Sequence, residues 1–86
     1  MYFAYIMRCA DGTLYTGYTD DIARREAMHN SGRGAKYTRS RLPVKMVYHE
    51  SFATRSEAMK RECAIKRLSR EQKLKLIADH SNTRQE

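Results

Sequence analysis

The start of the chain carries the pattern that most constrains the fold. Residues 2–8 place apolar side chains on both alternating faces, as in a strand that is covered on both sides. Residues 10–12 read Ala-Asp-Gly, and an Asp-Gly pair is a strong signal for a hairpin turn. Residues 13–18 return as a second strand that contains Gly17. The sequence therefore predicts an antiparallel hairpin.

The length of this turn decides on which face of the sheet two tyrosines lie. A two-residue turn would pair residues whose numbers sum to 23, which puts Tyr5 and Tyr15 on opposite faces. A three-residue loop over residues 10–12 changes the sum to 22 and puts both rings on one face. Such loops close with a left-handed residue, which suits Gly12. We expect positive φ and a one-residue bulge at Gly12, and both phenols on the face that meets Glu62.

A helix is expected directly after the hairpin. Either Thr19 or Asp20 can cap it, with carboxylates in the first turn where the helix dipole favours them. It should end near Asn30, because the Ser-Gly pair that follows can terminate a helix. Residues 31–43 then form a long connection, in which residues 35–40 could make a short helix.

A third strand completes the predicted sheet. Residues 45–52 have strand character, with Met46, Tyr48 and Phe52 on one face. Since the first two strands form a hairpin, we expect a three-stranded antiparallel sheet flanked by helices. The predicted fold is of the α+β type, in the order β-β-α-β-α-α.

Two capping boxes predict the last two helices. One is Thr-x-x-Glu at residues 54–57, and the other is Ser-x-x-Gln at residues 69–72, whose helix should end near residue 79. Residues 1–80 are therefore expected to form a single domain, followed by a polar, disordered tail at residues 81–86.

The charge of the chain indicates the class of its partner. The 86 residues include 17 Lys and Arg against 10 Asp and Glu, a net charge of +7. Such an excess points to an anionic partner, usually nucleic acid, although a basic surface can also serve solubility alone. The long connection has four cations and no acid, so it is either the surface that contacts the backbone phosphates or a solvated loop. Its candidate nucleic-acid-binding residues are Arg33, Lys36, Arg39 and Arg41, with Tyr37 between them to stack on a base.

The cysteines and the hydropathy indicate the compartment. Cys9 and Cys63 lie far apart and form no Cys-x-x-Cys spacing, which favours a reducing compartment over a zinc site or a disulfide framework. No apolar run approaches the ~20 residues of a membrane span. The N-terminus lacks the basic region of a signal peptide. We expect a cytoplasmic protein without a membrane partner.

Glu62 is the strongest candidate for chemistry, because it falls within the apolar face of its predicted helix. A carboxylate there carries a desolvation cost unless a cation meets it. That cation could be Lys66 one turn later, or an arginine across the core. It could equally be a divalent metal ion, since Mg²⁺ is often held by one or two carboxylates plus substrate phosphates. The apolar residues of this face are Ala58, Met59, Cys63 and Ile65.

Four further residues have both an ordinary and a functional interpretation. Arg25 and His29 share a helix face, either as surface residues or as a phosphate clamp beside a group that titrates or orients water. Tyr5 and Tyr15 lie on adjacent strands, either as packing residues or as hydroxyl groups directed at a phosphate or a water.

Taken together, these residues resemble the GIY-YIG nuclease superfamily, and most of all its small stand-alone bacterial members. The family's Gly-Ile-Tyr and Tyr-Ile-Gly segments correspond to residues 3–5, Phe-Ala-Tyr, and residues 15–17, Tyr-Thr-Gly. Both tyrosines and the second glycine are kept, while the first glycine and both isoleucines are replaced. The resemblance extends over about residues 2–78 and includes the segment 32–38, which is similar to one typical of the small members.

Three single positions also match the family's pattern. Its helical Arg-x-x-x-His matches Arg25 and His29, and its metal-binding glutamate matches Glu62. The resemblance implies phosphodiester hydrolysis in DNA with one bound divalent ion, Mg²⁺ or Mn²⁺. Glu62 would hold the metal, Arg25 would steady the phosphate, and a tyrosine, alone or with His29, would help to deprotonate the attacking water. Since a free tyrosine has a pKa near 10, such a base needs a metal or a cation beside it.

The resemblance leaves the substrate open. Branched, flapped or damaged DNA is expected, RNA is not excluded, and specificity would come from nucleic-acid shape or from a partner protein. The alternative is a nucleic-acid-binding module that keeps the nuclease fold with little or no catalysis and acts in a repair or RNA-processing assembly.

Overall fold

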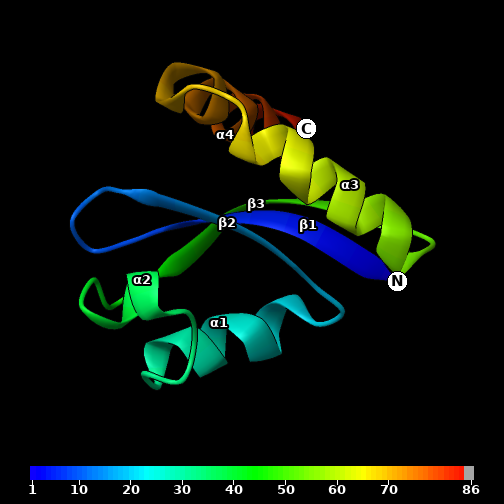
Figure 1. Cartoon of the computed structure of the whole chain (residues 1–86). Helices are drawn as coiled ribbons and strands as arrows, with labels where there is room; N and C mark the ends of the chain where they lie inside the picture. Colours follow the sequence, from blue (N-terminus) through cyan, green and yellow to red (C-terminus); the bar gives the residue numbers. More distant parts are fainter. Residues whose placement is uncertain (85–86) are drawn as a thin grey trace.

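The hairpin provides the central strand and one edge of a three-stranded antiparallel sheet (Figure 1). β1 spans Tyr2–Arg8, β2 spans Leu14–Thr19, and β3 spans Lys45–Phe52. The strand order is β2-β1-β3, which leaves β2 at an edge. The structure, a computed structural model, describes residues 1–84. The predicted α+β fold and the order of its elements are confirmed.

The turn of the hairpin has the predicted three-residue loop. Met7 lies opposite Tyr15, so paired numbers sum to 22. Gly12 has a φ of +86° and donates its N–H to the carbonyl of Cys9 at 2.9 Å. The N–H of Cys9 donates in turn to the carbonyl of Thr13 at 2.8 Å. Gly12 and Thr13 thus both lie opposite Cys9, the residue that follows β1, and this is the expected one-residue bulge.

A second bulge in β3 corrects one prediction. Ile6 pairs with Tyr48, but the next residue, Met7, pairs with Met46. Val47 is therefore an extra residue in β3, and a bulge changes the face on which the residues beyond it lie. The prediction that Met46 shares a face with Tyr48 is wrong, because Met46 packs with Met7 on the opposite face of the sheet.

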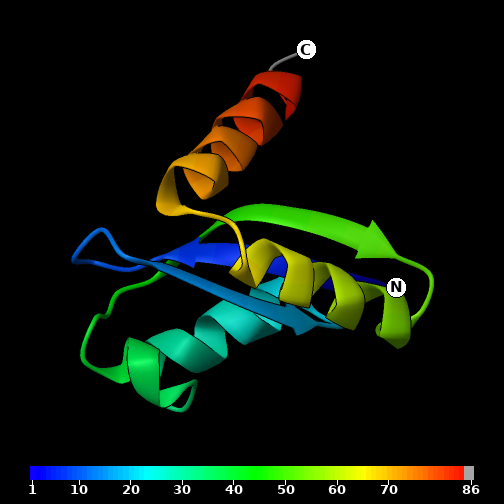
Figure 2. The ribbon, with the colours of Figure 1, turned by 45° about the horizontal axis from the view of Figure 1, so that its top comes forward.

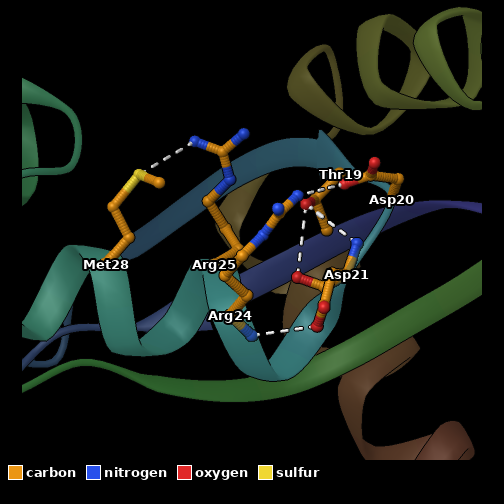
Figure 3. Close-up of polar contacts among 6 residues, drawn as sticks. All are labelled: Thr19, Asp20, Asp21, Arg24, Arg25 and Met28. Carbon is orange, nitrogen blue, oxygen red and sulfur yellow. Dashed lines mark hydrogen bonds and ion pairs between the residues drawn. The ribbon is translucent and has the colours of Figure 1, made fainter.

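The first helix, α1, spans Ile22–Asn30 and begins later than predicted (Figure 3). Its N-cap is Asp21, whose carboxylate accepts the N–H of Arg24 at 3.0 Å. Thr19 instead accepts the N–H of Asp21 at 3.2 Å, and Asp20 forms an ion pair with Arg24 at 2.7 Å. The predicted cap residues and the acidic first turn were therefore wrong, because both carboxylates precede the helix.

The end of α1 and the connection after it follow the prediction more closely. Gly32 takes a left-handed φ of +82°, which ends the helix after Asn30. The Asn30 side chain accepts the N–H of Val44 at 2.7 Å and donates to its carbonyl at 3.0 Å. A short helix, α2, spans Lys36–Arg39 within the predicted residues 35–40. The amide of Asn30 thus holds the chain that enters β3 against α1.

The last two helices begin at the two predicted capping boxes. α3 spans Arg55–Lys66 and is preceded by the reciprocal Thr54 and Glu57 bonds. α4 spans Arg70–Arg84 and is preceded by the equivalent bonds of residues 69–72. The backbone of α4 is helical beyond residue 79, into the segment predicted as a tail, and residues 85–86 lie outside the described residues.

Helices cover both faces of the sheet (Figures 1 and 2). α1 and α2 lie on one face, over a core that includes Tyr5 and Met7. α3 and α4 lie on the other face, over a core that includes Ala4 and Ile6. α3 contacts all three strands, whereas α4 contacts β3 and extends away from the sheet. No helix in the described part of the chain is both long and apolar enough to cross a membrane.

Candidate active site

A cleft of about 590 Å³ is lined by side chains from β1, β2, α1 and α3. It includes β2, the edge strand, and reaches both the α1 face and the α3 face of the sheet. Tyr5 and Tyr15 share one face, as predicted, but it is the face covered by α1, whereas Glu62 comes from α3 on the other face. The prediction that both phenols lie on the face that meets Glu62 is therefore wrong, and the three side chains share the cleft only around the edge strand. All of the side chains predicted to be catalytic lie along this cleft. They are Tyr5, Tyr15, Arg25, His29 and Glu62. Residues that are far apart in sequence, from two strands and two helices, therefore share one surface depression.

Tyr5 reaches the cleft across a glycine of the edge strand. It lies opposite Gly17, and a Cβ atom on Gly17 would stand only 2.5 Å from the Tyr5 hydroxyl oxygen. The Tyr5 side chain is only 2% exposed. Burial raises the pKa of Tyr5 above its usual value, the nearby Tyr15 and Glu62 raise it further, and Arg25 opposes them. Tyr5 is therefore a neutral phenol that keeps its proton near pH 7.

His29 is buried beneath Tyr5. Its Nε2 lies 3.5 Å from the Tyr5 hydroxyl, and its Nδ1 lies 2.9 Å from the hydroxyl of Thr38. Tyr15 packs beside the imidazole, with ring centroids 5.5 Å apart. Burial lowers the pKa of His29, and the positive charge of Arg25 lowers it further. The imidazole is therefore neutral near pH 7 and able to accept a proton.

Two residues that hold the His29 ring in place were not identified from the sequence. The imidazole of His29 packs directly on the backbone of Gly34, where a Cβ would overlap the ring. Thr38 is fully buried and contacts the ring from α2. Both belong to the segment 32–38 that resembles the small family members, and this resemblance is the signal that could have found them.

Arg25 and its neighbour Arg24 have different surroundings (Figure 3). Arg24 forms the ion pair with Asp20, while Arg25 extends to Met28, with 3.7 Å between Nη1 and the sulfur. Within residues 1–84, Arg25 forms no ion pair with an acid. Its positive charge at the cleft is therefore available to an anionic ligand.

Glu62 lies on the side of α3 that faces the sheet, as do Ala58 and Ile65, which are fully buried. The apolar face drawn from the sequence was partly wrong, because Met59 is 42% exposed and Cys63 is exposed as well. The placement of Glu62 on the inner side of the helix nevertheless follows from its spacing with Ala58 and Ile65.

The carboxylate of Glu62 has little to neutralise it. Its side chain is 16% exposed, and Oε2 lies 3.7 Å from Nζ of Lys66, which is 53% exposed. No other ion pair or hydrogen bond reaches the Glu62 carboxylate from the described residues. The ion pair with Lys66 is therefore present, but it is long and open to solvent, so it offsets only part of the desolvation cost.

The Glu62 carboxylate fits a divalent ion such as Mg²⁺ or Mn²⁺ that takes few protein ligands, rather than a metal coordinated entirely by protein side chains. Among the described residues, no group of three His, Cys, Asp or Glu side chains is placed to hold a metal. Glu62 supplies a single hard oxygen ligand at the cleft. Mg²⁺ is commonly bound in this way, with waters and substrate phosphates as its remaining ligands.

The basic connection is partly tied to the hairpin. The ring of Tyr37 stacks near Tyr15 at 6.0 Å, and the guanidinium of Arg41 lies 4.1 Å above the Tyr37 ring. Arg41 also forms an ion pair with Asp11 at 3.1 Å. Arg41 thus binds the connection to the turn, and Tyr37 packs it against β2. The cations of the connection that are exposed, and that form no ion pair within the described chain, are Arg33, Lys36 and Arg39.

A second arginine in the cleft was missed in the sequence. Arg55, the first residue of α3, lines the cleft and donates to the hydroxyl of Tyr18 at 3.1 Å. A guanidinium is always charged in proteins, and within residues 1–84 Arg55 forms no ion pair with an acid. No periodic signal marks Arg55, because its place in the cleft depends on how α3 packs against β2.

Several bacterial and archaeal proteins are similar to this chain over most of its length. A UPF0213 protein of Streptococcus agalactiae is 52% identical over 80 residues, which is 93% of this chain and 91% of that protein. A UPF0213 protein of Halobacterium salinarum is 59% identical over 73 residues, covering 85% of this chain and 95% of that protein.

Solved structures and a family comparison give the same result. The solution NMR structure of a UPF0213 protein from Bacillus halodurans is 47% identical and has a TM-score of 0.57, covering 91% of this chain and 84% of that one. A protein from E. faecalis, also solved by NMR, is 51% identical and has a TM-score of 0.55, covering 84% of this chain and 77% of that one. The GIY-YIG catalytic domain matches residues 1–75. This chain therefore belongs to the GIY-YIG family of nuclease catalytic domains.

Proposed function

We propose that this protein is a divalent-metal-dependent endonuclease that hydrolyses phosphodiester bonds in DNA, with the cleft as its active site. One observation carries the proposal: two tyrosines, an arginine, a histidine and a carboxylate from four separate elements line one cleft of a chain with a net charge of +7. A non-catalytic binding surface has no need of a buried histidine beside a tyrosine hydroxyl or of a mostly buried carboxylate.

The pair formed by Tyr5 and His29 is the proton acceptor in this proposal. His29 is neutral, and its Nε2 lies 3.5 Å from the Tyr5 hydroxyl. A long contact of this kind often shortens when substrate fills an active site. As a water attacks the phosphorus, Tyr5 takes a proton from the water and passes its own proton to Nε2. Tyr5 therefore never carries a full negative charge, which its burial would oppose.

Arg25 and Glu62 act on the phosphate from opposite sides of the sheet. The Arg25 guanidinium, which has no acidic partner within residues 1–84, donates to the non-bridging oxygens and holds the phosphate in line with the water. Glu62 would hold Mg²⁺ or Mn²⁺, which when bound supplies positive charge to the phosphate and the leaving oxygen. The bond to the leaving oxygen breaks as the new bond forms, and that oxygen takes its proton from solvent.

The DNA backbone is proposed to run from the cleft along the basic connection. Arg33, Lys36 and Arg39 are exposed there, while Arg41 and Tyr37 fix the connection to the hairpin. These contacts are to phosphates and carry no sequence information. The substrate class that fits is branched, flapped or damaged DNA, which the protein would recognise by its shape. The single domain over residues 1–80 would cut this DNA. A partner protein would be a further source of specificity.

The test is cleavage of a panel of labelled linear, flapped, branched and damaged DNA molecules with Mg²⁺, with Mn²⁺ and with chelator. The native protein should cleave at least one structure, and only with metal. Glu62→Gln should lower the rate by about 10²- to 10³-fold, a typical loss for one charge-stabilising group. Glu71→Gln, an exposed acid on α4, should cleave as the native protein does.

The same assay separates this proposal from its alternative. If Glu62→Gln cleaves as fast as the native protein, Glu62 holds no catalytic metal. If the native protein binds the panel tightly but cleaves none of it with either metal, the protein is a nucleic-acid-binding module that has kept the nuclease fold. Comparing Tyr5→Phe with Tyr15→Phe identifies the acting tyrosine, and the larger loss is expected for Tyr5.

A further inference from the structure

We infer that Thr38 is a positioning residue, which fixes the tautomer of His29 and thereby directs the hydroxyl proton of Tyr5 away from the cleft. The hydrogen-bond geometry behind this inference is independent of catalysis. Its consequence for the reaction rests on the proposed function.

The hydroxyl of Thr38 has only one proton, and that proton is already used. Thr38 is fully buried, and its Oγ1 donates to the backbone carbonyl of Ala35 at 2.9 Å. Toward His29 the same oxygen can therefore only accept. Since it lies 2.9 Å from Nδ1, the proton of the neutral imidazole belongs on Nδ1.

The position of that proton determines what the other ring nitrogen can do. A neutral imidazole with its proton on Nδ1 has a lone pair on Nε2. This nitrogen faces the Tyr5 hydroxyl at 3.5 Å, so the phenol is the donor in that contact. The oxygen lone pairs of Tyr5 are then left for the cleft, which the side chain lines.

The first turn of α2 holds Thr38 in this role. The N–H of Thr38 also donates to the carbonyl of Ala35, at 3.0 Å, and its own carbonyl accepts the N–H of Arg41 at 2.9 Å. Gly34 supplies bare backbone under the imidazole. These backbone bonds fix the position of Thr38, and turning its hydroxyl away from His29 would break the bond to the Ala35 carbonyl.

The chemical gain is a one-way path for the proton. Water gives a proton to the Tyr5 oxygen, Tyr5 gives its proton to Nε2, and the resulting imidazolium keeps its Nδ1–H bonded to Thr38. With the opposite tautomer, Nε2–H would donate to Tyr5. The phenol proton would then point into the cleft, and no acceptor would remain.

The direct test is NMR of the ring nitrogens of His29 at pH 7.5 in the isotope-labelled protein without metal or DNA. The native protein and Thr38→Ser, which keeps the hydroxyl, should have the Nδ1–H pattern. Thr38→Val removes the hydroxyl at similar volume and should shift His29 toward the Nε2–H pattern. Thr16→Val is the matched control, because the Thr16 hydroxyl is buried without a hydrogen-bond partner in the described structure.

The NMR result stands whether or not the protein cleaves DNA. An Nε2–H pattern in the native protein, or an unchanged pattern in Thr38→Val, overturns the inference. If the proposed function holds, Thr38→Val should also lower the cleavage rate by about 10- to 100-fold, by analogy with partners that fix the tautomer of metal-bound histidines. Thr38→Ser should restore most of the rate. Full activity in a Thr38→Val protein with altered tautomer would exclude the positioning role.

Discussion

Among the single residues, two adjacent arginines of α1 make the clearest matched pair. Arg25 lines the cleft without an acidic partner in residues 1–84, while Arg24 does not line the cleft and is paired with Asp20 at its rim. Arg25→Ala should lower cleavage by about 10²-fold or more, because an oriented phosphate donor is lost. Arg24→Ala should cost less than about 1 kcal/mol of stability and little activity, since an exposed ion pair contributes little. Equal losses of activity in the two variants, measured by single-turnover cleavage, would exclude Arg25 as the phosphate ligand.

The pKa of His29 links this residue to the stability of the fold. Burial and Arg25 lower the pKa of His29 in the folded state, so below about pH 6.5 the unfolded chain binds protons more readily. The stabilisation is fully present above pH 6.5 and is lost as the pH falls toward the folded value. Urea unfolding at pH 7.5 and pH 5.0 should therefore show a smaller free energy of unfolding at pH 5.0. This pH difference should shrink in His29→Gln. The same pH difference in both proteins would contradict a depressed pKa for His29.

For the strands and helices, β2 depends on a glycine at which a Cβ has no space. Gly17→Ala would press a Cβ against the Tyr5 hydroxyl, whereas Gly12→Ala meets nothing within 4 Å and suffers only from its φ of +86°. Gly12→Ala should cost about 1–2 kcal/mol and keep activity. Gly17→Ala should lose most cleavage, because Tyr5 must leave its place beside His29. Thermal unfolding and cleavage rates of both variants measure this. Normal activity in Gly17→Ala would contradict the path of Tyr5 across β2.

The same elements separate what the sequence could predict from what it could not. The three-residue hairpin loop and both capping boxes depend on neighbouring residues, and all were predicted correctly. The bulge at Val47 depends on the pairing of β3 with β1, so it was missed. The cap of α1 moved to Asp21 because Thr19 ends an edge strand and bonds to the backbone of the cap residue. Local sequence patterns thus predicted which helices and strands form, whereas the bulge in β3 and the first residue of α1 depend on long-range packing.

The candidate site divides in the same way. Glu62 could be found because a carboxylate on the inner side of a helix is unusual, and its spacing with Ala58 and Ile65 is visible in the sequence. Thr38 and Arg55 could not be found from periodicity. Thr38 acts through a ring from another helix, and Arg55 reaches the cleft only after α3 has docked on the sheet.

For the whole molecule, the net charge of +7 predicts salt-dependent binding of DNA. If about four phosphates are neutralised, by Arg25 and the exposed cations of the connection, the slope of log affinity against log salt should be about −3 to −4. Lys36→Ala should make the slope less steep by about 1, and Lys75→Ala on α4, away from the cleft and the connection, should leave it unchanged. Fluorescence anisotropy across a salt series gives these slopes. An affinity that does not change with salt concentration would show that the connection does not contact DNA.

The central claim is that the side chains of the cleft act around one divalent ion bound at Glu62. The most direct measurement is an NMR titration with Mn²⁺, whose unpaired electrons broaden nearby resonances, using the native protein and Glu62→Gln with and without a short DNA. The account predicts broadening centred on Glu62, Tyr5 and Tyr15 in the native protein, and its loss in Glu62→Gln. Broadening centred elsewhere, or unchanged in Glu62→Gln, would contradict it.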